Sequence, residues 1–389
     1  MKKRTVILFV LLLAVSNIAT AFASVQFVTG DVKEVMTTRA LERFLKKNYL
    51  RAKEISDEDF EIGRRKGTVE ALNDPYSEYF TEEEYNSFVE ATTGEFFGIG
   101  VQIGADANSK MITVIAPIKG SPAEAAGIQS GDKIVSVNGI DYTAEDLEEA
   151  VKHIKGDKGT TVKLGILPKD GGELKEVEVK RDEIRMESVI TADLGDIAYI
   201  GLTQFEDDTL ADFKAALNRA KTDGKKGLIL DLRGNPGGIL EAAVGVSDLL
   251  LGEGDIVSAK DNRGKEVFHY ASDADRWEKP LAVLANGGSA SASEIVSGAI
   301  KDHKAGTLVG EKTFGKGVVQ SLLPLPGGGG LKLTTSEYFT PSGVNIQDKG
   351  IEPDVKVALP KEVTGIGPEY KEQDTQLQKA IEIIEKSDR

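Results

Sequence analysis

Hydrophobic and polar positions divide this chain into segments with different periodicities. From about residue 185 onward, short apolar runs alternate with stretches whose apolar residues recur every three or four positions. The run 227–232 is almost entirely apolar, as in a strand buried on both faces. The stretch 209–221 places Phe213, Ala216 and Leu217 on one helical face. Because strands and helices alternate, the pattern predicts an α/β layered core with a mixed sheet.

Two other patterns precede this core. Residues 30–95 are charged and helical in period, with Leu41, Phe44 and Leu45 on one face, which predicts a helical arm or cap. Residues 96–181 are rich in glycine and β-branched residues. They predict several strands, the first over 96–103, a short helix over 121–127 and a longer helix at 144–154. After residue 360, an apolar stripe that includes Leu377 predicts a docking helix in a C-terminal tail, 361–389.

The amino terminus has the pattern of an export signal. Lys2, Lys3 and Arg4 precede an apolar run at 6–15, and Ala21-Phe22-Ala23 supplies the small residues of a cleavage site. We therefore expect residues 1–23 to be a cleaved signal peptide, with an uncleaved membrane anchor as the alternative. The expected location is extracytoplasmic, in a periplasm or outside the cell envelope.

Composition excludes several classes of function. The formal net charge of -15 argues against nucleic acid as the main partner. The absence of cysteine removes disulfides, thiol catalysis and cysteine-based metal sites. With only three histidines and no His-Glu-x-x-His pattern, we expect no metal site.

Candidate chemistry gathers between residues 284 and 320. A block of Gly, Ala and Ser at 287–293 opens a predicted helix, where uncovered N–H groups and a positive end can stabilise an oxyanion. Lys316 follows between Gly315 and Gly317, which put no side chain in its way. We interpret this pair of segments as nucleophile and base, although Ser289, Ser291 and Ser293 are equivalent by residue type.

A second glycine-rich segment, at 231–238, begins at the end of the apolar run 227–232. The serine block likewise follows a predicted strand, at 281–285. Active sites of open α/β sheets usually lie at the carboxyl ends of strands. We therefore expect the two turns to face one pocket.

Several motifs together resemble the carboxyl-terminal processing (tail-specific) proteases. They are Asp74-Pro-Tyr-Ser77, Asp231-Leu-Arg-Gly-Asn-Pro-Gly-Gly238, Gly288-Ser-Ala-Ser-Ala-Ser-Glu294, Gly310-Glu-Lys-Thr-Phe-Gly-Lys-Gly317 with Gln320, Tyr338-Phe-Thr-Pro-Ser-Gly343 and Gly350-Ile-Glu-Pro-Asp354. The resemblance implies a crotonase-like α/β core over 185–360 and a serine/lysine endopeptidase without a cofactor. By motif position it implies Ser291 as nucleophile, Lys316 as general base and Gln320 as the residue that orients the lysine. It also implies oxyanion donors from Ala292 and from Gly237 or Gly238.

The segment 96–181 resembles a bacterial PDZ domain in Gly98-Ile-Gly-Val, Ser121-Pro-Ala and Gly131-Asp through Asn138-Gly139. The resemblance implies a groove beside helix 144–154 that binds the C-terminal tails of protein substrates. Its carboxylate site would be the N–H groups of Phe97, Gly98, Ile99 and Gly100. The whole chain is thus expected to be a multidomain α/β protein with a PDZ domain and a helical N-terminal arm, in which the terminal helical segments can form a homodimer contact.

The residues also suggest how Lys316 would act. A serine hydroxyl needs a base, and burial would have to bring the lysine pKa from about 10.4 towards roughly 7 to 8. If 316–320 is a strand, Lys316 and Gln320 project to the same side. A glutamine can then hold the amine by a hydrogen bond without keeping it protonated, as a carboxylate would.

Three alternatives compete with this interpretation. His303 could serve as base to Ser291, but it stands among charged residues typical of a solvent-facing position. Gly310-x-x-x-x-Gly-Lys316 is close to a phosphate-binding loop, but Gly317 replaces the Ser or Thr that would hold magnesium. A PDZ adaptor without catalysis would have no use for Ser291, Lys316 and Gln320.

Overall fold

The computed structural model of the protein describes residues 16, 20, 32–93, 96–106, 109–185, 187–273 and 276–387. The expected signal segment, 1–23, therefore lies outside the described residues except for Ser16 and Thr20. Within the described ranges, no helix is long and apolar enough to cross a membrane. The chain forms two compact units, Met1–Thr81 and Glu82–Arg389, so the last helix of the expected arm belongs to the second unit.

The first unit is helical. It contains α2 (Val32–Asn48), η1 (Ala52–Glu54), α3 (Asp57–Glu70) and the short β1 (Glu78–Phe80). Ser56 begins α3 through a capping box, in which its hydroxyl accepts the Asp59 N–H and the Asp59 carboxylate accepts the Ser56 N–H. The predicted apolar stripe on α2 is exposed: 57% of Leu41 and 63% of Phe44 face solvent. This unit therefore leaves apolar surface uncovered.

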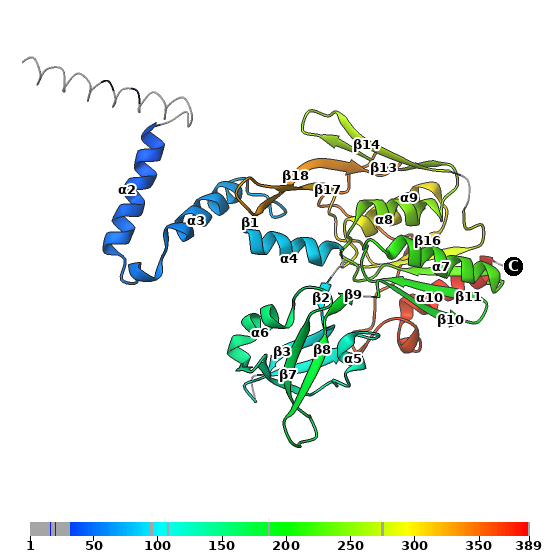
Figure 1. The fold of residues 1–389 in the computed structure, drawn as a ribbon. Helices are drawn as coiled ribbons and strands as arrows, with labels where there is room; N and C mark the ends of the chain where they lie inside the picture. The colour runs from blue at the N-terminus through cyan, green and yellow to red at the C-terminus, as the bar shows by residue number, and fades with distance from the viewer. Residues whose placement is uncertain are drawn as a thin grey trace, which may run out of the picture. The chain divides into compact units, whose positions relative to one another are not determined.

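The second unit begins with α4 (Glu82–Thr93) and a β-rich segment (Figure 1). The elements of this segment are β2 (Phe96–Gly98), β3 (Val101–Asp106), β4 (Met111–Pro117), α5 (Pro122–Ala125), β5 (Lys133–Val137), β6 (Ile140–Asp141), η2 (Ala144–Asp146), α6 (Leu147–Ile154), β7 (Thr161–Leu167), β8 (Lys175–Lys180) and β9 (Asp182–Ile184). The strand order is β3-β4-β5-β7-β8, with β6 beside β5, and β2 pairs with β9. Residues such as Ile112, Ile134 and Leu164 form a buried cluster that belongs to this segment alone.

One glycine breaks the strand that the sequence predicted over 96–103. Gly100 has φ +71°, and a Cβ there would lie 2.4 Å from the Ser121 Cβ, so no other residue fits. The strand is therefore divided into β2 and β3. The helix predicted at 144–154 is present, with its first turn as the 3₁₀ helix η2.

The remaining chain forms a layered α/β core. Its elements are β10 (Val189–Leu194), β11 (Ile197–Leu202), α7 (Thr209–Thr222), β12 (Gly227–Asp231), α8 (Leu240–Asp248), β13 (Gly254–Asp261), β14 (Glu266–Ser272), β15 (Leu281–Ala285), α9 (Ala292–His303), β16 (Thr307–Gly310), β17 (Val318–Pro324), β18 (Gly330–Phe339), β19 (Val355–Lys356), η3 (Pro368–Tyr370) and α10 (Thr375–Ser387). The central sheet has the order β10-β11-β12-β15-β16-β19. Strand β10 is antiparallel to β11 and the other pairs are parallel, so the predicted mixed sheet and α/β fold are confirmed.

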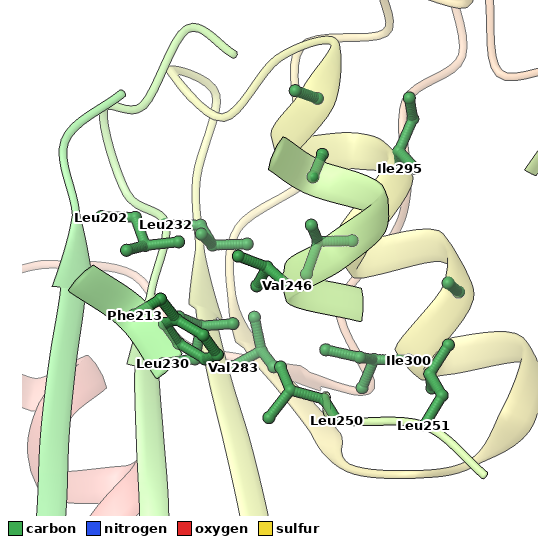
Figure 2. Packing of buried hydrophobic residues seen from close by; sticks show 14 of the residues in the cluster. Leu202, Phe213, Leu230, Leu232, Val246, Leu250, Leu251, Val283, Ile295 and Ile300 are labelled. Carbon is green, nitrogen blue, oxygen red and sulfur yellow. The ribbon is translucent and has the colours of Figure 1, made fainter. Parts of the chain in front are cut away.

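Both faces of the central sheet are covered. On β12, Leu228 and Leu230 are buried in the cluster that includes α7, α8 and α9, which Figure 2 shows from close by. Ile229 points to the opposite face and is buried with Leu377 and Ile384 of α10. This two-sided burial is the reason for the continuous apolar run on β12. The predicted docking helix in the C-terminal tail is therefore α10.

A second sheet covers the outer side of α8 and α9 (Figure 1). In this sheet β18 is antiparallel to both β13 and β17, and β14 pairs with β13. Val257 of β13, Tyr338 of β18 and Val296 of α9 belong to the same buried cluster. The loop between β16 and β17 is thereby fixed beside the first turn of α9, to which Gly315 and Lys316 are hydrogen-bonded.

Candidate active site

Ser291 occupies a strained position at the start of α9. Residues 286–291 are here called the serine turn. Ser291 follows β15 and the turn 286–290, and it is the N-cap of α9. Its φ of 53° and ψ of −114° belong to a region that glycine normally occupies in tight turns. Such strain costs energy of order 1–3 kcal/mol and persists only where the surroundings enforce it, often at functional sites.

The three serines of the block differ in their hydrogen bonds. The hydroxyl of Ser289 donates to the Leu232 carbonyl at 2.8 Å, and that of Ser293 donates to the Asn235 carbonyl at 2.9 Å. Both side chains are completely buried. Ser291 is only partly buried, and its hydroxyl donates to no carbonyl oxygen within the described part of the chain. Of the three hydroxyls, it is the one available for chemistry.

The turn at 231–238, here called the glycine turn, packs directly on the serine turn. Buried Asn235 joins them, since its carbonyl accepts the N–H of Ala290 at 3.1 Å. Gly237 has φ +108°, and a Cβ there would lie 2.9 Å from the Ser291 Cβ and 3.0 Å from the Ala292 nitrogen. The two turns that the sequence predicted to face one pocket therefore lie side by side.

Two main-chain N–H groups at this junction find no acceptor in the part of the chain that the structure describes. The Gly237 N–H donates to the Asn235 side chain at 2.8 Å. Across the described residues, the N–H groups of Gly238 and Ala292 have no protein acceptor. Phe205 pairs with the Gly237 carbonyl and the Ile239 N–H, so the Gly238 N–H points away from Phe205. Gly238 and Ala292, the latter at the positive end of α9, can therefore stabilise a negative oxygen better than Gly237 can.

One buried carboxylate holds the backbones of Ser291 and Lys316. Oε2 of Glu294 accepts the N–H of Ser291 at 3.0 Å and the N–H of Lys316 at 2.9 Å. Oε1 accepts the Thr313 hydroxyl at 2.6 Å and the Gly315 N–H at 2.7 Å. Burial raises the pKa of Glu294, whereas these four hydrogen bonds favour its ionised form. Glu294 thus fixes the serine turn and the lysine loop, 313–317, at a common point.

Tyr338 reinforces this connection. Its hydroxyl donates to the Lys316 carbonyl at 2.6 Å and lies 3.3 Å from the Ser291 carbonyl. Burial raises the pKa of Tyr338, so the hydroxyl keeps its proton and remains a donor. The glycines beside Lys316 serve a contact that the sequence did not suggest: a Cβ on Gly317 would lie 2.5 Å from the Gln347 nitrogen, so the lysine loop packs against residues 345–350.

The spacing argument for Gln320 does not hold. Strand β17 begins at Val318, so Lys316 lies before the strand and strand alternation does not relate it to Gln320. The ladder between β17 and β18 is also irregular between Val319 and Gln320. The Gln320 amide donates to the Thr334 hydroxyl at 3.3 Å. Both Lys316 and Gln320 are partly buried.

The two alternative sites are disfavoured by their positions. His303 is at the other end of α9, about 18 Å along the helix from Ser291, and bonds the Asp255 carbonyl at 2.7 Å. The Gly310–Lys316 segment leads into strand β17, whereas a phosphate-binding loop leads into a helix. Among the residues that the structure describes, no group of three or more His, Asp or Glu side chains could hold a metal ion.

Sequence reasoning missed the supporting residues Glu294, Tyr338, Asn235 and Arg233, although all four are part of the quoted motifs. A signal for Glu294 was present, because it is the only charged residue between positions 287 and 300. A lone charge inside an apolar, small-residue helix must be paired or hydrogen-bonded. Three of its four partners could not be read from the sequence, because they come from residues 313–316.

An apolar groove of about 240 Å³ lies between β3 and α6. Phe97, Gly98, Ile99 and Gly100 line one end of it, and Val151 and Ile154 of α6 line its side. The carbonyls of Ile99 and Gly100 are paired with residues 118–123, while their N–H groups have no acceptor among the described residues. Two residues that line an apolar groove therefore have main-chain donors that are not used within the described residues.

The family models match two parts of the chain. The model described as peptidase family S41 matches residues 196–357, and the PDZ domain model matches residues 87–167. The first range covers the layered core from β11 to β19, including the serine and glycine turns. The second ends before β8, which pairs with β7 and completes the β-rich segment.

Individual proteins are similar over most of the chain. A carboxy-terminal-processing protease of Bartonella bacilliformis is 40% identical over 293 residues, which are 74% of this chain and 67% of that protein. A "Probable CtpA-like serine protease" of Staphylococcus haemolyticus is 40% identical over 76% of this chain but only 59% of its own length. The solved photosystem II D1 C-terminal processing protease is 26% identical, covers 89% of this chain and 99% of its own, and superposes with a TM-score of 0.52.

Replacing Glu294 by Gln tests whether this carboxylate is the shared anchor of the serine turn and the lysine loop. All four partners of this carboxylate are donors, so the new amide NH₂ would face donors and leave buried N–H groups unpaired, at a cost of about 1–3 kcal/mol. We expect a lower free energy of unfolding in urea and slower labelling of Ser291 by a fluorophosphonate. Glu311→Gln, at an exposed position two residues before the lysine loop, is the control. Equal stability and labelling in the two variants would contradict the anchor.

Proposed function

The chain belongs to peptidase family S41, and from this premise we propose that it is a serine endopeptidase that selects proteins by their C-terminal tails. Ser291 would be the nucleophile and Lys316 the general base. The β-rich segment, matched by the PDZ model, would bind the tail. The proposed organisation is an exported chain with a helical N-terminal segment, a PDZ domain, the protease core and a C-terminal helix.

The observation that carries the proposal is the shared anchor at Glu294. The same carboxylate oxygen accepts the backbone N–H groups of Ser291 and Lys316. The two residues proposed as nucleophile and base are thus tied through their main chains to one atom. The shared carboxylate therefore keeps the two main-chain segments that carry the hydroxyl and the amine close together.

The proposed reaction follows from these groups. Neutral Lys316 removes the Ser291 hydroxyl proton as the oxygen attacks the peptide carbonyl, and the negative oxygen receives hydrogen bonds from the N–H groups of Ala292 and Gly238. The Lys316 ammonium then protonates the leaving amine, which frees the new amino terminus. Water attacks the acyl-enzyme with Lys316 again as base, which releases the acid and restores Ser291. Gln320 would position the lysine without adding charge.

The groove supports the tail-binding part of the proposal. A tail added along β3 would place its terminal carboxylate near the unpaired N–H groups of Ile99 and Gly100. Its last side chain would then enter an apolar space lined by Val151 and Ile154. These features favour tails with a free carboxylate and an aliphatic last residue.

Catalysis can be tested with a peptide that carries an apolar C-terminal tail. We expect the wild-type protein to cleave it and Ser291→Ala and Lys316→Ala to lose at least about 10³-fold in kcat/KM, because each removes one reacting group. Ser289→Ala, which changes a buried serine of the same turn, should keep the chemistry if it folds. Cleavage by Ser291→Ala would contradict the proposal. A wild-type protein that binds the tail without cleaving it would instead favour a PDZ adaptor.

Tail binding is tested separately by Val151→Asp. A carboxylate in the apolar groove would repel the tail carboxylate and should weaken binding about tenfold or more, measured by fluorescence anisotropy. Glu148→Ala, exposed on the same helix and outside the groove, should bind normally. An amidated tail should bind weakly to every variant. The proposed tail site is wrong if the amide and the free acid bind equally well.

Export and self-association complete the proposal. Mass spectrometry of the mature amino terminus tests cleavage after residue 23.

A homodimer would bury the exposed Leu41 and Phe44 of α2, whereas α10 already covers its apolar face within the chain and offers less surface. We expect sedimentation of the chain lacking residues 1–23 to give twice the monomer mass, and Phe44→Asp to give the monomer. A wild-type monomer would exclude this contact.

A further inference from the structure

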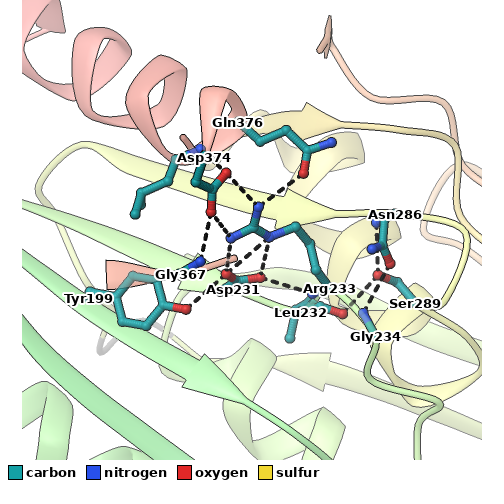
Figure 3. Close-up of polar contacts among 11 residues, drawn as sticks. Tyr199, Asp231, Leu232, Arg233, Gly234, Asn286, Ser289, Gly367, Asp374 and Gln376 are labelled. Atoms are coloured by element: carbon teal, nitrogen blue, oxygen red, sulfur yellow. Dashed lines mark hydrogen bonds and ion pairs between the residues drawn. The ribbon is translucent and has the colours of Figure 1, made fainter. Parts of the chain in front are cut away.

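A buried cluster of charges lies behind the glycine turn. The Arg233 guanidinium donates to Asp231 at 2.6–3.1 Å and to Asp374 at 2.8–2.9 Å, and it donates to the Gln376 side-chain oxygen at 3.0 Å (Figure 3). The Arg233 and Asp374 side chains are completely buried. We call these four residues the arginine cluster. Two of them belong to the end of the chain, more than 140 residues from the other two.

The C-terminal half of the cluster is itself fixed. Asp374 accepts the Leu377 N–H at 3.0 Å, which caps the first turn of α10, and the Gly367 N–H at 2.8 Å. Gln376 donates to the Val357 carbonyl at 2.8 Å. Movement of Arg233 would therefore disturb the start of α10.

The other half of the cluster, Asp231 and Arg233, lies in the glycine turn that carries the proposed oxyanion donor Gly238. The Gly234 N–H, next to Arg233, donates to the Asn286 side chain of the serine turn at 3.0 Å (Figure 3). Asn235 follows with its bonds to Ala290 and Ser293, and then come Gly237 and Gly238. The glycine turn is thus held by the serine turn on one side and by the arginine cluster on the other.

The cluster places strict demands on residue type. Arg233 forms paired bonds with both carboxylates, which the single ammonium of a lysine cannot reproduce. Burial alone would raise the pKa of Asp374, but the hydrogen bonds from Arg233, Gly367 and Leu377 lower it below the ordinary value. Asp374 is therefore ionised at neutral pH. The Tyr199 hydroxyl donates to Asp231 at 2.8 Å.

We propose that Asp374 and Gln376 are positioning residues that hold the oxyanion donor of Gly238 in place through Arg233. The C-terminal segment 367–377 is then part of the catalytic apparatus and not only a packing element. This inference rests on the proposed peptidase function. A purely structural role would affect folding without changing how the folded enzyme stabilises a tetrahedral adduct.

The test compares Asp374→Asn with Ile384→Ala. The first replaces a charged acceptor of Arg233 by an amide of the same size. The second removes apolar contacts at the far end of the same helix, where Ile384 packs beside Gly227 at the start of β12. Both should lower Tm, so kinetics are measured at a temperature where both are folded. Gln376→Met, which leaves the Asp374 cap intact, replaces Asp374→Asn if that variant fails to fold.

In Asp374→Asn we expect kcat to fall about tenfold or more with KM within about twofold, and affinity for a peptide boronate, which forms a tetrahedral adduct on serine, to fall in parallel. Ile384→Ala should keep both kcat and boronate affinity. Unchanged kcat in Asp374→Asn, or a lower kcat with unchanged boronate affinity, would overturn the inference. A wild-type protein that cleaves no tailed peptide would instead refute the proposed function.

Discussion

The site depends on satisfying one buried negative charge. Glu294 lies completely buried in the first turn of α9, and within the described part of the chain four hydrogen-bond donors contact its carboxylate. A buried carboxylate is costly unless it is fully hydrogen-bonded, so the residues that supply the donors must stay where they are. Those donors belong to the serine turn and to the lysine loop. The electrostatic need of one side chain therefore fixes two segments that lie more than 20 residues apart.

The strained backbone of Ser291 can persist because the layers around it are rigid. Helix α9 is buried along nearly its whole length, between the central sheet and the sheet that contains β13 and β18. The glycine turn closes the space beside Ser291. Because the serine turn and the arginine cluster both hold the glycine turn, the Ser291 backbone has little freedom to relax. Rigid surroundings of this kind preorganise main-chain donors, which then need not reorient when charge develops.

Binding and chemistry are assigned to parts of the chain with separate cores. The β-rich segment that the PDZ model matches has its own buried cluster, and the groove lies at its edge. The layered core that the S41 model matches has two clusters, one on each face of its sheet. Such a division lets the groove proposed for tail binding vary without disturbing the packing around Ser291.

The sequence by itself determined what depends on local pattern. The apolar run of β12, the stripe of α7 and the glycine-bounded motifs predicted the mixed α/β core, the β-rich segment, Lys316 and a block of three candidate serines, because periodicity and turn chemistry are encoded within a few residues. Among the three serines, the family resemblance singled out Ser291. Only the tertiary structure decided how these pieces meet. It bonded the Ser289 and Ser293 hydroxyls to main-chain carbonyls and paired the Gly237 N–H with the Asn235 side chain. It placed Lys316 outside the strand that was expected to align it with Gln320. It also joined Glu294 to residues 313–316 and Arg233 to Asp374. These outcomes depend on contacts between distant segments, and such contacts follow from the packing of whole layers, which no local pattern specifies.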